Sequence, residues 1–239
     1  MLLGLKTGDE PETGTMCGRY NIIDDPFTRD LLEALDIEAR LTTRYNIAPT
    51  EEVPVIRRRE DHYELVSMHW WLIPSWVREP GTRYSMFNAR AETLNESPAF
   101  RAPFRHQRCI VPASSFIEWH TEPGGKQPWL IRPCDGAIAF AGIWDHWGQG
   151  QDSILSCCIV TCEAVAQFRD IHNRMPVMLR PDQFERWLDP ASDSGSLLPW
   201  LLPQLPGPFE LWPIDPHINN ARHKETPVMI GDRRQIRDD

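Results

Sequence analysis

Two long apolar runs constrain the fold of this chain more than any other feature of its sequence. Residues 137–144 and residues 154–161 are almost continuously hydrophobic. Strands that face solvent on one side alternate between apolar and polar residues, whereas strands buried on both faces read as short continuous apolar runs. We therefore expect both segments to be central strands of a sheet.

The other predicted elements are short, because 22 prolines interrupt the 239 residues. Apolar residues at helical spacing predict a helix over residues 27–39, with Asp24 or Asp25 as its N-cap and Pro26 in its first turn. A second short helix is predicted over residues 181–188. Alternating or apolar patterns predict further strands at residues 53–56, 63–68, 108–113, 114–119, 128–131 and 209–212.

Composition excludes several classes of protein. The chain is 41% hydrophobic and 25% charged, which is typical of a soluble globular protein. Its net charge of −9 argues against a nonspecific nucleic-acid coat but leaves room for a local basic cleft. No apolar run reaches the roughly 18 residues of a membrane span, and no signal peptide is recognisable at the start. We expect a cytoplasmic protein without a membrane partner.

The six cysteines do not form a recognisable framework. They lack the paired C-x₂-C spacing of zinc sites, and adjacent residues on a strand point to opposite faces. We expect no metal, no cofactor and, in a reducing compartment, free thiols packed in the core. The six are Cys17, Cys109, Cys134, Cys157, Cys158 and Cys162.

Cys17 differs from the others because it follows Met16. If Met16 is removed, Cys17 carries an α-amine with a pKa of about 7.7–8.0 beside a thiol with a pKa of about 8.5. Such a 1,2-aminothiol traps an aldehyde twice, first as an imine and then as a thiazolidine ring. Residues 1–15 are predicted to be disordered, either as a removable leader or as a mis-assigned extension ahead of a start at Met16.

Three further segments place polar side chains where they could form a site. Asn88, Arg90 and Glu92 alternate, so an extended backbone would put them on one face. Glu118 lies between two apolar neighbours, which predicts either a buried carboxyl with a raised pKa or an exposed strand glutamate. His172 is separated from Arg174 by one residue.

Two further surface features are predicted. Trp76 follows Pro74 and Ser75, so we expect it on a loop, where an exposed indole could stack on an unpaired base for about 1–3 kcal/mol. The residues between 101 and 108 predict a locally basic surface, formed by Arg101, Arg105, His106 and Arg108.

Seven segments, in order along the chain, resemble one known family. They are residues 16–20 (MCGRY), 44–50 (RYNIAPT), 72–76 (LIPSW), 88–93 (NARAET), 108–119 (RCIVPA followed by FIEW), 140–144 (FAGIW) and 171–176 (IHNRMP). Together they resemble the SOS-response-associated peptidase (SRAP) family, also called abasic-site processing proteins. The similarity spans nearly all of residues 16–230.

The resemblance implies the fold and the activity. The fold would be one α+β domain with a largely antiparallel, barrel-like sheet and flanking short helices. It would occupy residues 16–232, before a charged tail at residues 233–239. The partner would be single-stranded DNA containing abasic sites, bound by a monomer that is associated with the nucleoid when on DNA. The ring-opened sugar aldehyde would be captured as a thiazolidine in the SOS response to DNA damage.

The resemblance also assigns roles to individual residues. Cys17 would be the nucleophile, Asn88 would orient its amine and the sugar, Glu118 would be the general acid–base, and His172 would assist at a sugar hydroxyl. Self-processing would remove the residues before Cys17, and lyase activity is a further implied property. The DNA contacts would be Arg90 and Arg174 as phosphate clamps, Arg19 and Thr161 nearby, and Pro49 and Trp76 at the flanking bases.

Some features leave alternatives open. Trp71 stands where the family usually has glycine, which would reshape the DNA-facing loop. A thiol peptidase acting on other proteins through Cys17 and His172 would need no free amine. A noncovalent single-strand-binding module would use Trp76 and the arginines alone.

Overall fold

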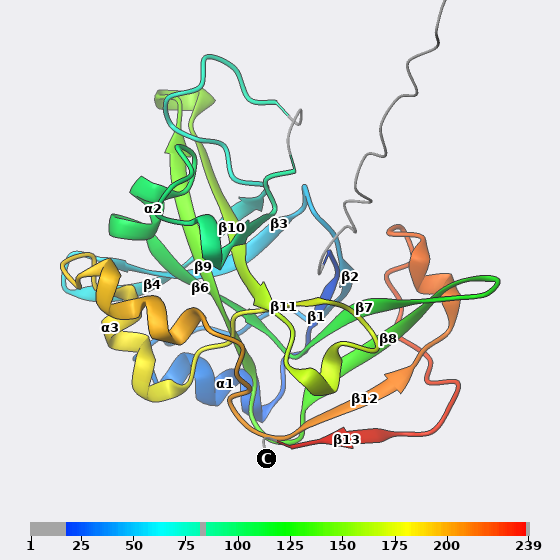
Figure 1. Ribbon diagram of the computed structural model, residues 1–239. Coiled ribbons are helices and arrows are strands. Elements are labelled where there is room, and N and C mark those ends of the chain that lie inside the picture. The colour runs from blue at the N-terminus through cyan, green and yellow to red at the C-terminus, as the bar shows by residue number, and fades with distance from the viewer. Residues whose placement is uncertain (1–17, 82–84, 238–239) are drawn as a thin grey trace, which may run out of the picture.

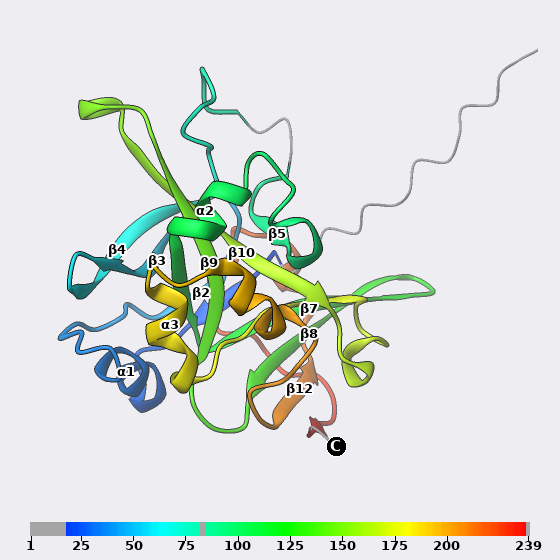
Figure 2. The ribbon, with the colours of Figure 1, turned by 60° about the vertical axis from the view of Figure 1, so that its left-hand side comes forward.

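Five strands close into a barrel at the centre of the computed structural model, which describes residues 18–81 and 85–237 (Figures 1 and 2). Each strand pairs with the next in the order β10, β4, β3, β6 and β9, and β9 pairs back with β10. Closure leaves these strands no free edge. They are β3 (Glu52–Arg59), β4 (His62–Trp70), β6 (Arg108–Ala113), β9 (Ile138–Trp147) and β10 (Ile154–Glu163).

The two apolar runs are confirmed as central strands, since they form most of β9 and β10. The far half of β10 leaves the barrel and gains two other partners. β5 (Asn88–Arg90) runs parallel to it and β11 (Arg174–Pro176) runs antiparallel. Figure 2 shows β5 beside β10. One strand thus belongs both to the core and to the region that carries the candidate site.

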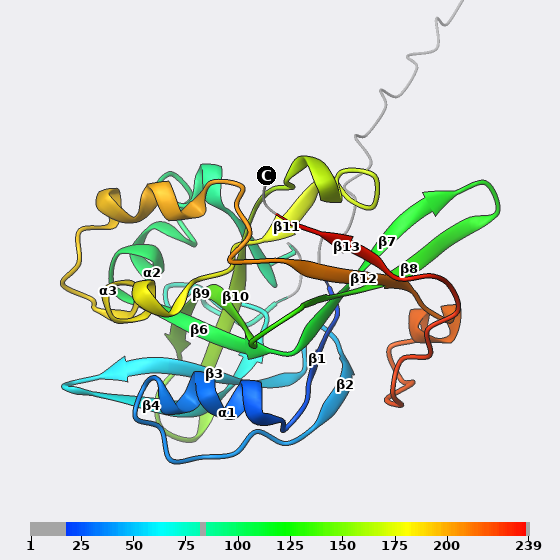
Figure 3. The same ribbon diagram turned by 90° about the horizontal axis from the view of Figure 1, so that it is seen from below.

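A second sheet lies beside the barrel, on the right in Figure 1. Its order is β13, β12, β8, β7, β1 and β2, and all neighbours are antiparallel. Figure 3 shows β12 and β13 side by side along this sheet. The strands are β1 (Tyr20–Ile22), β2 (Arg44–Ile47), β7 (Ser115–Glu122), β8 (Gly125–Pro133), β12 (Phe209–Pro213) and β13 (Arg234–Ile236). The sheet therefore extends into the segment predicted as a charged tail.

The helices are short and flank the sheets, which confirms the predicted α+β class. α1 (Pro26–Glu33) begins as predicted, with Asp25 capping it and Pro26 in its first turn. It ends before residue 39, and Asp36 beyond it has a positive φ of 53°. No helix among the described residues is long and apolar enough to cross a membrane. The others are α2 (Arg101–His106), α3 (Phe184–Leu188), η1 (Ala91–Thr93), η2 (Gly150–Asp152), η3 (Ala166–Phe168), η4 (Pro181–Gln183), η5 (Ser194–Leu201) and η6 (Pro216–Asn219).

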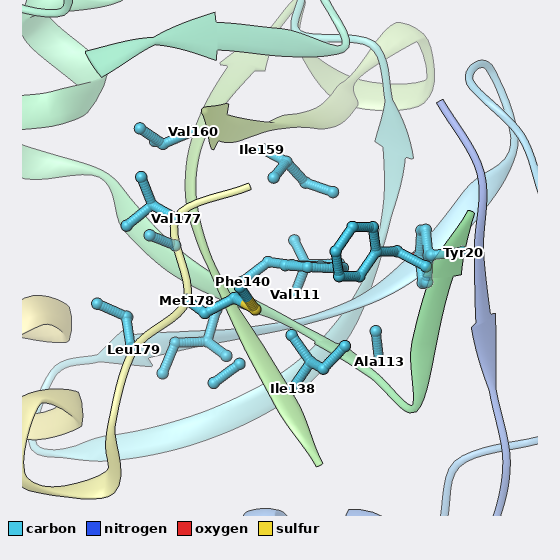
Figure 4. Packing of buried hydrophobic residues seen from close by; sticks show 14 of the residues in the cluster. Tyr20, Val111, Ala113, Ile138, Phe140, Ile159, Val160, Val177, Met178 and Leu179 are labelled. Carbon is cyan, nitrogen blue, oxygen red and sulfur yellow. The ribbon is translucent and has the colours of Figure 1, made fainter. Parts of the chain in front are cut away.

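Aromatic side chains join the barrel to the second sheet. Phe140 of β9 contacts Tyr20 of β1 and Phe116 of β7, with ring centroids 6.0 Å apart in both pairs. Tyr20 also meets Trp70 of β4 at 5.1 Å. Figure 4 shows Tyr20, Phe140 and Val111 among the buried side chains of this core. This packing fixes β1 and β7 against the barrel.

Four of the five cysteines in the described residues are buried free thiols, as predicted. Burial raises the pKa of Cys109, Cys157 and Cys158 well above the usual value, and it raises the pKa of Cys162 to about 12. These groups are therefore protonated at neutral pH. Because the thiolate is the nucleophile and the metal ligand, they are chemically inert core residues.

The prediction of a basic surface between residues 101 and 108 is wrong for Arg108. This side chain is buried, and it donates hydrogen bonds to the carbonyl oxygens of Trp187 at 2.6 Å and Phe104 at 2.7 Å. It also bonds the carbonyl of Asp189. A guanidinium has five donors in a fixed fork, so Arg108 ties α2 and α3 to the barrel instead of facing solvent.

Gly142 of β9 provides a test of the barrel packing. A Cβ at this position would lie 2.8 Å from Cys109 Sγ and 3.3 Å from the carbonyl oxygen of Cys158. Overpacking of a filled core costs about 1–3 kcal/mol. We expect Gly142→Ala to lower the thermal midpoint by several degrees, measured by circular dichroism. Gly207→Ala, where a Cβ meets nothing within 4 Å, should leave it unchanged. Equal midpoints for the two variants would contradict the described packing.

Candidate active site

Cys17 lies outside the described residues, but the residues that follow it are paired with strand β7. Tyr20 pairs with Phe116 and Asn21 with Ser115, and the Ile117 amide donates to the carbonyl oxygen of residue 19 at 3.0 Å. Continuing this antiparallel register by two residues sets Gly18 opposite Glu118. Gly18 is buried. The residue bonded to Cys17 is therefore held beside Glu118.

Glu118 is buried, with 2% of its surface exposed, which decides between the two alternatives left by the sequence. Side chains alternate along a strand, so Glu118 shares the face of Phe116, which packs in the main core. Its neighbours Ile117 and Trp119 belong to a separate cluster on the other face. The carboxyl thus lies at the point where β7 leaves the core. Burying a carboxyl disfavours its charged form.

Asn88 and Arg90 lie on β5, two residues apart and hence on the same face. Asn88 is buried with 8% exposure, whereas Arg90 is exposed. The register places Arg90 opposite Thr161 of β10. The extended backbone predicted through residue 93 ends at Arg90, because η1 begins at Ala91. Glu92 therefore does not continue the alternation, and its position is set by a helical turn.

Arg174 is held by two elements at once. Its two terminal nitrogens donate to both carboxylate oxygens of Glu92, at 2.6 and 2.9 Å. One of them, Nη2, also donates to the carbonyl oxygen of Thr161 at 2.7 Å. Thr161 is fully buried. The guanidinium thus joins η1, β10 and β11, and the predicted phosphate clamp already has a carboxylate partner.

His172 is hydrogen-bonded through one ring nitrogen. The backbone N–H of Arg174 lies 3.0 Å from Nδ1, and the carbonyl oxygen of Arg174 lies 3.2 Å from the same atom. The N–H can only donate and the carbonyl oxygen can only accept, so Nδ1 of a neutral ring can bond only one of them. The N–H is the shorter contact, and on that ground we assign Nδ1 as the acceptor and place the ring proton on Nε2. Burial lowers the pKa of His172 and outweighs the hydrogen bond with the Arg174 backbone, which raises it, while the positive charges of Lys126 and Arg174 lower it further. His172 therefore offers a hydrogen-bond donor from Nε2.

The segment carrying His172 packs next to the hairpin formed by β7 and β8. Phe168, in η3, contacts Phe116 of β7 with ring centroids 6.3 Å apart. Lys126, at the start of β8, is close enough for its charge to act on His172. The fold thus brings Glu118, His172 and the β5–β10–β11 group into one region from four separate parts of the chain.

Arg19 is placed differently from the other candidates. It alternates with Tyr20, so it faces the cluster on the outer side of β7, where its guanidinium carbon lies 5.9 Å from the centroid of Trp119. Burial lowers its pKa, and the charge of Glu51 opposes that shift. The structure does not bring Arg19 to the face of Glu118.

Pro49 lies in a half-exposed turn that is fixed from both ends. Thr50 donates its N–H to the carbonyl oxygen of Trp70 at 3.0 Å, and Ala48 donates to a carboxylate oxygen of Glu51 at 3.0 Å. Glu51 also pairs with Arg44 at 2.7 Å. The turn therefore presents Pro49 on a rigid support.

Asn46 anchors this turn to a distant segment and was not predicted as a functional residue. It is fully buried with a positive φ of 51°. Its amide nitrogen lies 3.1, 3.0 and 2.9 Å from the carbonyl oxygens of Ile218, Asn220 and His223. Sequence offered one signal, an asparagine of the kind that tolerates a left-handed backbone. It offered none for partners more than 170 residues away.

Trp76 is confirmed as a loop residue, with 65% of its surface exposed. Its loop is fixed by Ser75, whose N–H donates to the carboxylate of Asp145 at 2.8 Å. Trp71, which stands where the family usually has glycine, packs against Phe87, with ring centroids 5.6 Å apart. It therefore supports the residue that precedes Asn88.

Comparison with known proteins gives one consistent group. The family model described as SOS response associated peptidase (SRAP) matches residues 16–221. The abasic site processing protein YoaM of Bacillus subtilis is 34% identical over 221 residues, covering 90% of this chain and 97% of YoaM. The abasic site processing protein YedK of Escherichia coli is 32% identical over 180 residues, covering 72% of this chain and 79% of YedK.

Solved structures agree on the fold. A phage-related protein from Bordetella bronchiseptica superimposes with a TM-score of 0.65 at 28% identity, covering 82% of this chain and 93% of that protein. A protein from Bacteroides thetaiotaomicron superimposes with a TM-score of 0.69 at 24% identity, covering 82% of this chain and 91% of that protein.

The protonation of His172 can be measured directly. Its pKa lies below the ordinary value of 6.5 in the folded state. The unfolded chain then binds more protons as the pH falls from 6.5 towards the folded pKa, so stability is lost over that window. We expect NMR titration to show this lowered pKa. The unfolding free energy of His172→Gln should fall less between pH 7 and pH 5 than that of wild type.

The matched control is His106→Gln, which alters an exposed histidine on α2. It should show the same pH dependence as wild type. A folded-state pKa for His172 at or above 6.5 would contradict the partly buried position described for its ring.

Proposed function

The chain belongs to the SOS response associated peptidase family, and on that premise we propose that it captures abasic sites in single-stranded DNA. The capture is covalent and uses the α-amine and thiol of Cys17, after the residues before it have been removed. The protein thereby shields the lesion in the cytoplasm during the DNA damage response. Relatives named as abasic site processing proteins support the choice of lesion.

One observation carries the proposal, namely the pairing of Tyr20 with Phe116 and of the Ile117 N–H with the carbonyl oxygen of Arg19, a register that when continued sets Gly18 opposite Glu118. Consecutive Cα atoms are about 3.8 Å apart across a trans peptide bond. Cys17 is therefore one residue from a position that pairs with a buried carboxyl. Of the other cysteines, four are buried thiols with raised pKa values, and they cannot compete for an aldehyde.

The reaction balances without a cofactor. The α-amine of Cys17 adds to the aldehyde carbon of the ring-opened sugar, and the resulting carbinolamine loses one water to give an imine. The thiol then adds to the imine carbon and its proton passes to the nitrogen, which closes the thiazolidine ring. Two bonds form to one carbon, and one water leaves.

Three residues handle protons and orientation in this reaction. Glu118 donates a proton to the departing hydroxyl and accepts one during ring opening, a role that suits a carboxyl held away from water. Asn88 orients the amine and the sugar. His172 donates a hydrogen bond from Nε2 to a sugar hydroxyl, which is the only donor its neutral ring retains when Nδ1 accepts from Arg174.

The DNA contacts surround this centre. Arg90 is exposed at the end of β5 and can meet a phosphate. Arg174 of β11, on the other side of β10, would meet one through the terminal nitrogens that now bond Glu92. Trp76 is exposed on its loop and can stack on a base, while Pro49 projects from its fixed turn. A local pair of arginines reconciles phosphate binding with the net charge of −9. Arg19, on the other face, supports Trp119.

The geometry disfavours a general thiol peptidase that pairs Cys17 with His172. A base needs a free lone pair, and the Nδ1 lone pair of His172 already accepts the N–H of Arg174. We therefore assign removal of the residues before Cys17 to self-processing, with Glu118 as the proton acceptor. The same carboxyl would serve a lyase step from the imine.

The proposal is tested by mixing the protein with an abasic single-stranded oligonucleotide and separating the products by denaturing electrophoresis. Protein starting at Cys17 should form an adduct that survives denaturation. Cys17→Ala should form none, because both the amine and the thiol must act. Glu118→Gln should slow adduct formation by about 10²–10⁴-fold, the usual contribution of a general acid–base, and leave the finished adduct stable.

Cys17→Ser is the matched variant: it keeps the α-amine, as Cys17→Ala does, but replaces the thiol with a hydroxyl of similar size, and it permits at most a labile imine. A full-rate, denaturation-resistant adduct from Cys17→Ala would overturn the proposal. So would an adduct formed by the chain from Met1 while the intact mass shows that the leader is still attached.

The role of Arg90 is tested by the salt dependence of binding. Each phosphate contact contributes about 0.7 to the slope of log K against log salt concentration for a single strand. Arg90→Ala should reduce the slope by about that amount in fluorescence anisotropy titrations. Arg40→Ala, which removes an exposed arginine near α1, should not change it. Equal slopes for Arg90→Ala and wild type would exclude a phosphate contact.

A further inference from the structure

Arg174 and Glu92 form the most complete ion pair in the candidate site. Both carboxylate oxygens of Glu92 accept from the two terminal nitrogens of Arg174, at 2.6 and 2.9 Å. This two-point geometry is the one in which arginine also binds a phosphate. A strand that used Arg174 as a phosphate clamp would therefore need the position that Glu92 occupies.

The two partners differ in how they are held. The side chain of Arg174 is only 15% exposed, and its Nη2 also donates to the carbonyl oxygen of Thr161 at 2.7 Å. The side chain of Glu92 is 49% exposed and lies in η1, a helix of three residues. A ligand arriving from solvent would meet the carboxylate first, and the guanidinium would keep its place when the carboxylate left.

Glu92 also lies close to Arg90. Burial raises the pKa of Glu92, but the hydrogen bonds and charge of Arg174, together with the charge of Arg90, outweigh it and bring the pKa below the ordinary value. The carboxylate is therefore ionised at neutral pH. It reduces the net charge of the two-arginine group from two to one.

We propose that Glu92 is an internal counter-ion. In the DNA-free protein its carboxylate is bonded to the two terminal nitrogens of Arg174, and a DNA phosphate displaces it from them. This inference rests on the proposed function and adds a specificity-determining residue to it. Noncovalent affinity for any single strand is kept low, because each phosphate must compete with the carboxylate. Undamaged strands are released, whereas an abasic strand is retained by its covalent bond.

Glu92→Gln tests the proposal because it removes the charge and keeps the shape of the side chain. We expect this variant to bind a fluorescein-labelled undamaged oligonucleotide about tenfold more tightly at low salt. The slope of log K against log salt concentration should steepen by about 0.7, the value for one additional phosphate contact. The measurement is fluorescence anisotropy over a series of salt concentrations.

Two controls separate this effect from a general change in charge. Glu96→Gln alters an exposed carboxylate four residues further on and changes the net charge by the same amount. It should leave affinity and slope nearly as in wild type. In an Arg174→Gln background, Glu92→Gln should lose its effect, because the fork for which carboxylate and phosphate compete is absent.

The outcomes are distinguishable. Glu92→Gln binding no more tightly than Glu96→Gln would show that the ion pair is structural only, and weaker binding would show that Glu92 holds Arg174 ready for phosphate. Either result would contradict the proposed role of Glu92 as a counter-ion. Failure of the wild-type protein to form an adduct with an abasic strand would instead contradict the proposed function. The comparison of the variants' affinities for undamaged strands would still stand. Thermal unfolding of each variant verifies that it is folded.

Discussion

The pairing of β1 with β7 is the contact on which the whole site depends. It is only a few residues long, yet aromatic packing of Tyr20 and Phe116 against Phe140 holds it from behind. Because side chains alternate along a strand, this packing also determines which face Glu118 occupies. A slip of one residue would turn Glu118 outward and bring Ile117 into its place. The core and the chemistry are thus specified by the same register.

β10 plays the corresponding role on the other side of the site. Its first half closes the barrel between β9 and β4, and its second half carries β5 and β11. A rigid barrel strand therefore sets the spacing between Asn88, Arg90 and Arg174. Such support suits a site whose groups must be held in place before the ligand arrives. The elements outside this frame, including η1 and the loop of Trp76, are more exposed.

Sequence predicted the parts that depend on local pattern. The apolar runs gave the central strands, and Asp25 with Pro26 gave the start of α1. It failed where a partner distant in sequence decides the outcome. Arg108 was predicted to be a surface charge, but its guanidinium is buried and bonded to carbonyl oxygens of α2 and α3. Nothing in the sequence near Arg174 indicated a partner, yet in the structure its guanidinium bonds the carboxylate of Glu92, 82 residues away. Long-range contacts of polar side chains leave no periodic trace in a sequence.

The most direct measurement is the location of the sugar remnant on the protein. After reaction with an abasic strand and digestion with nuclease and trypsin, tandem mass spectrometry should find the remnant on the peptide of residues 17–19. The mass should equal that of peptide plus remnant minus one water, with both the amine and the thiol of Cys17 blocked. A remnant on a lysine, or on a peptide in which Met16 is still joined to Cys17, would contradict the account.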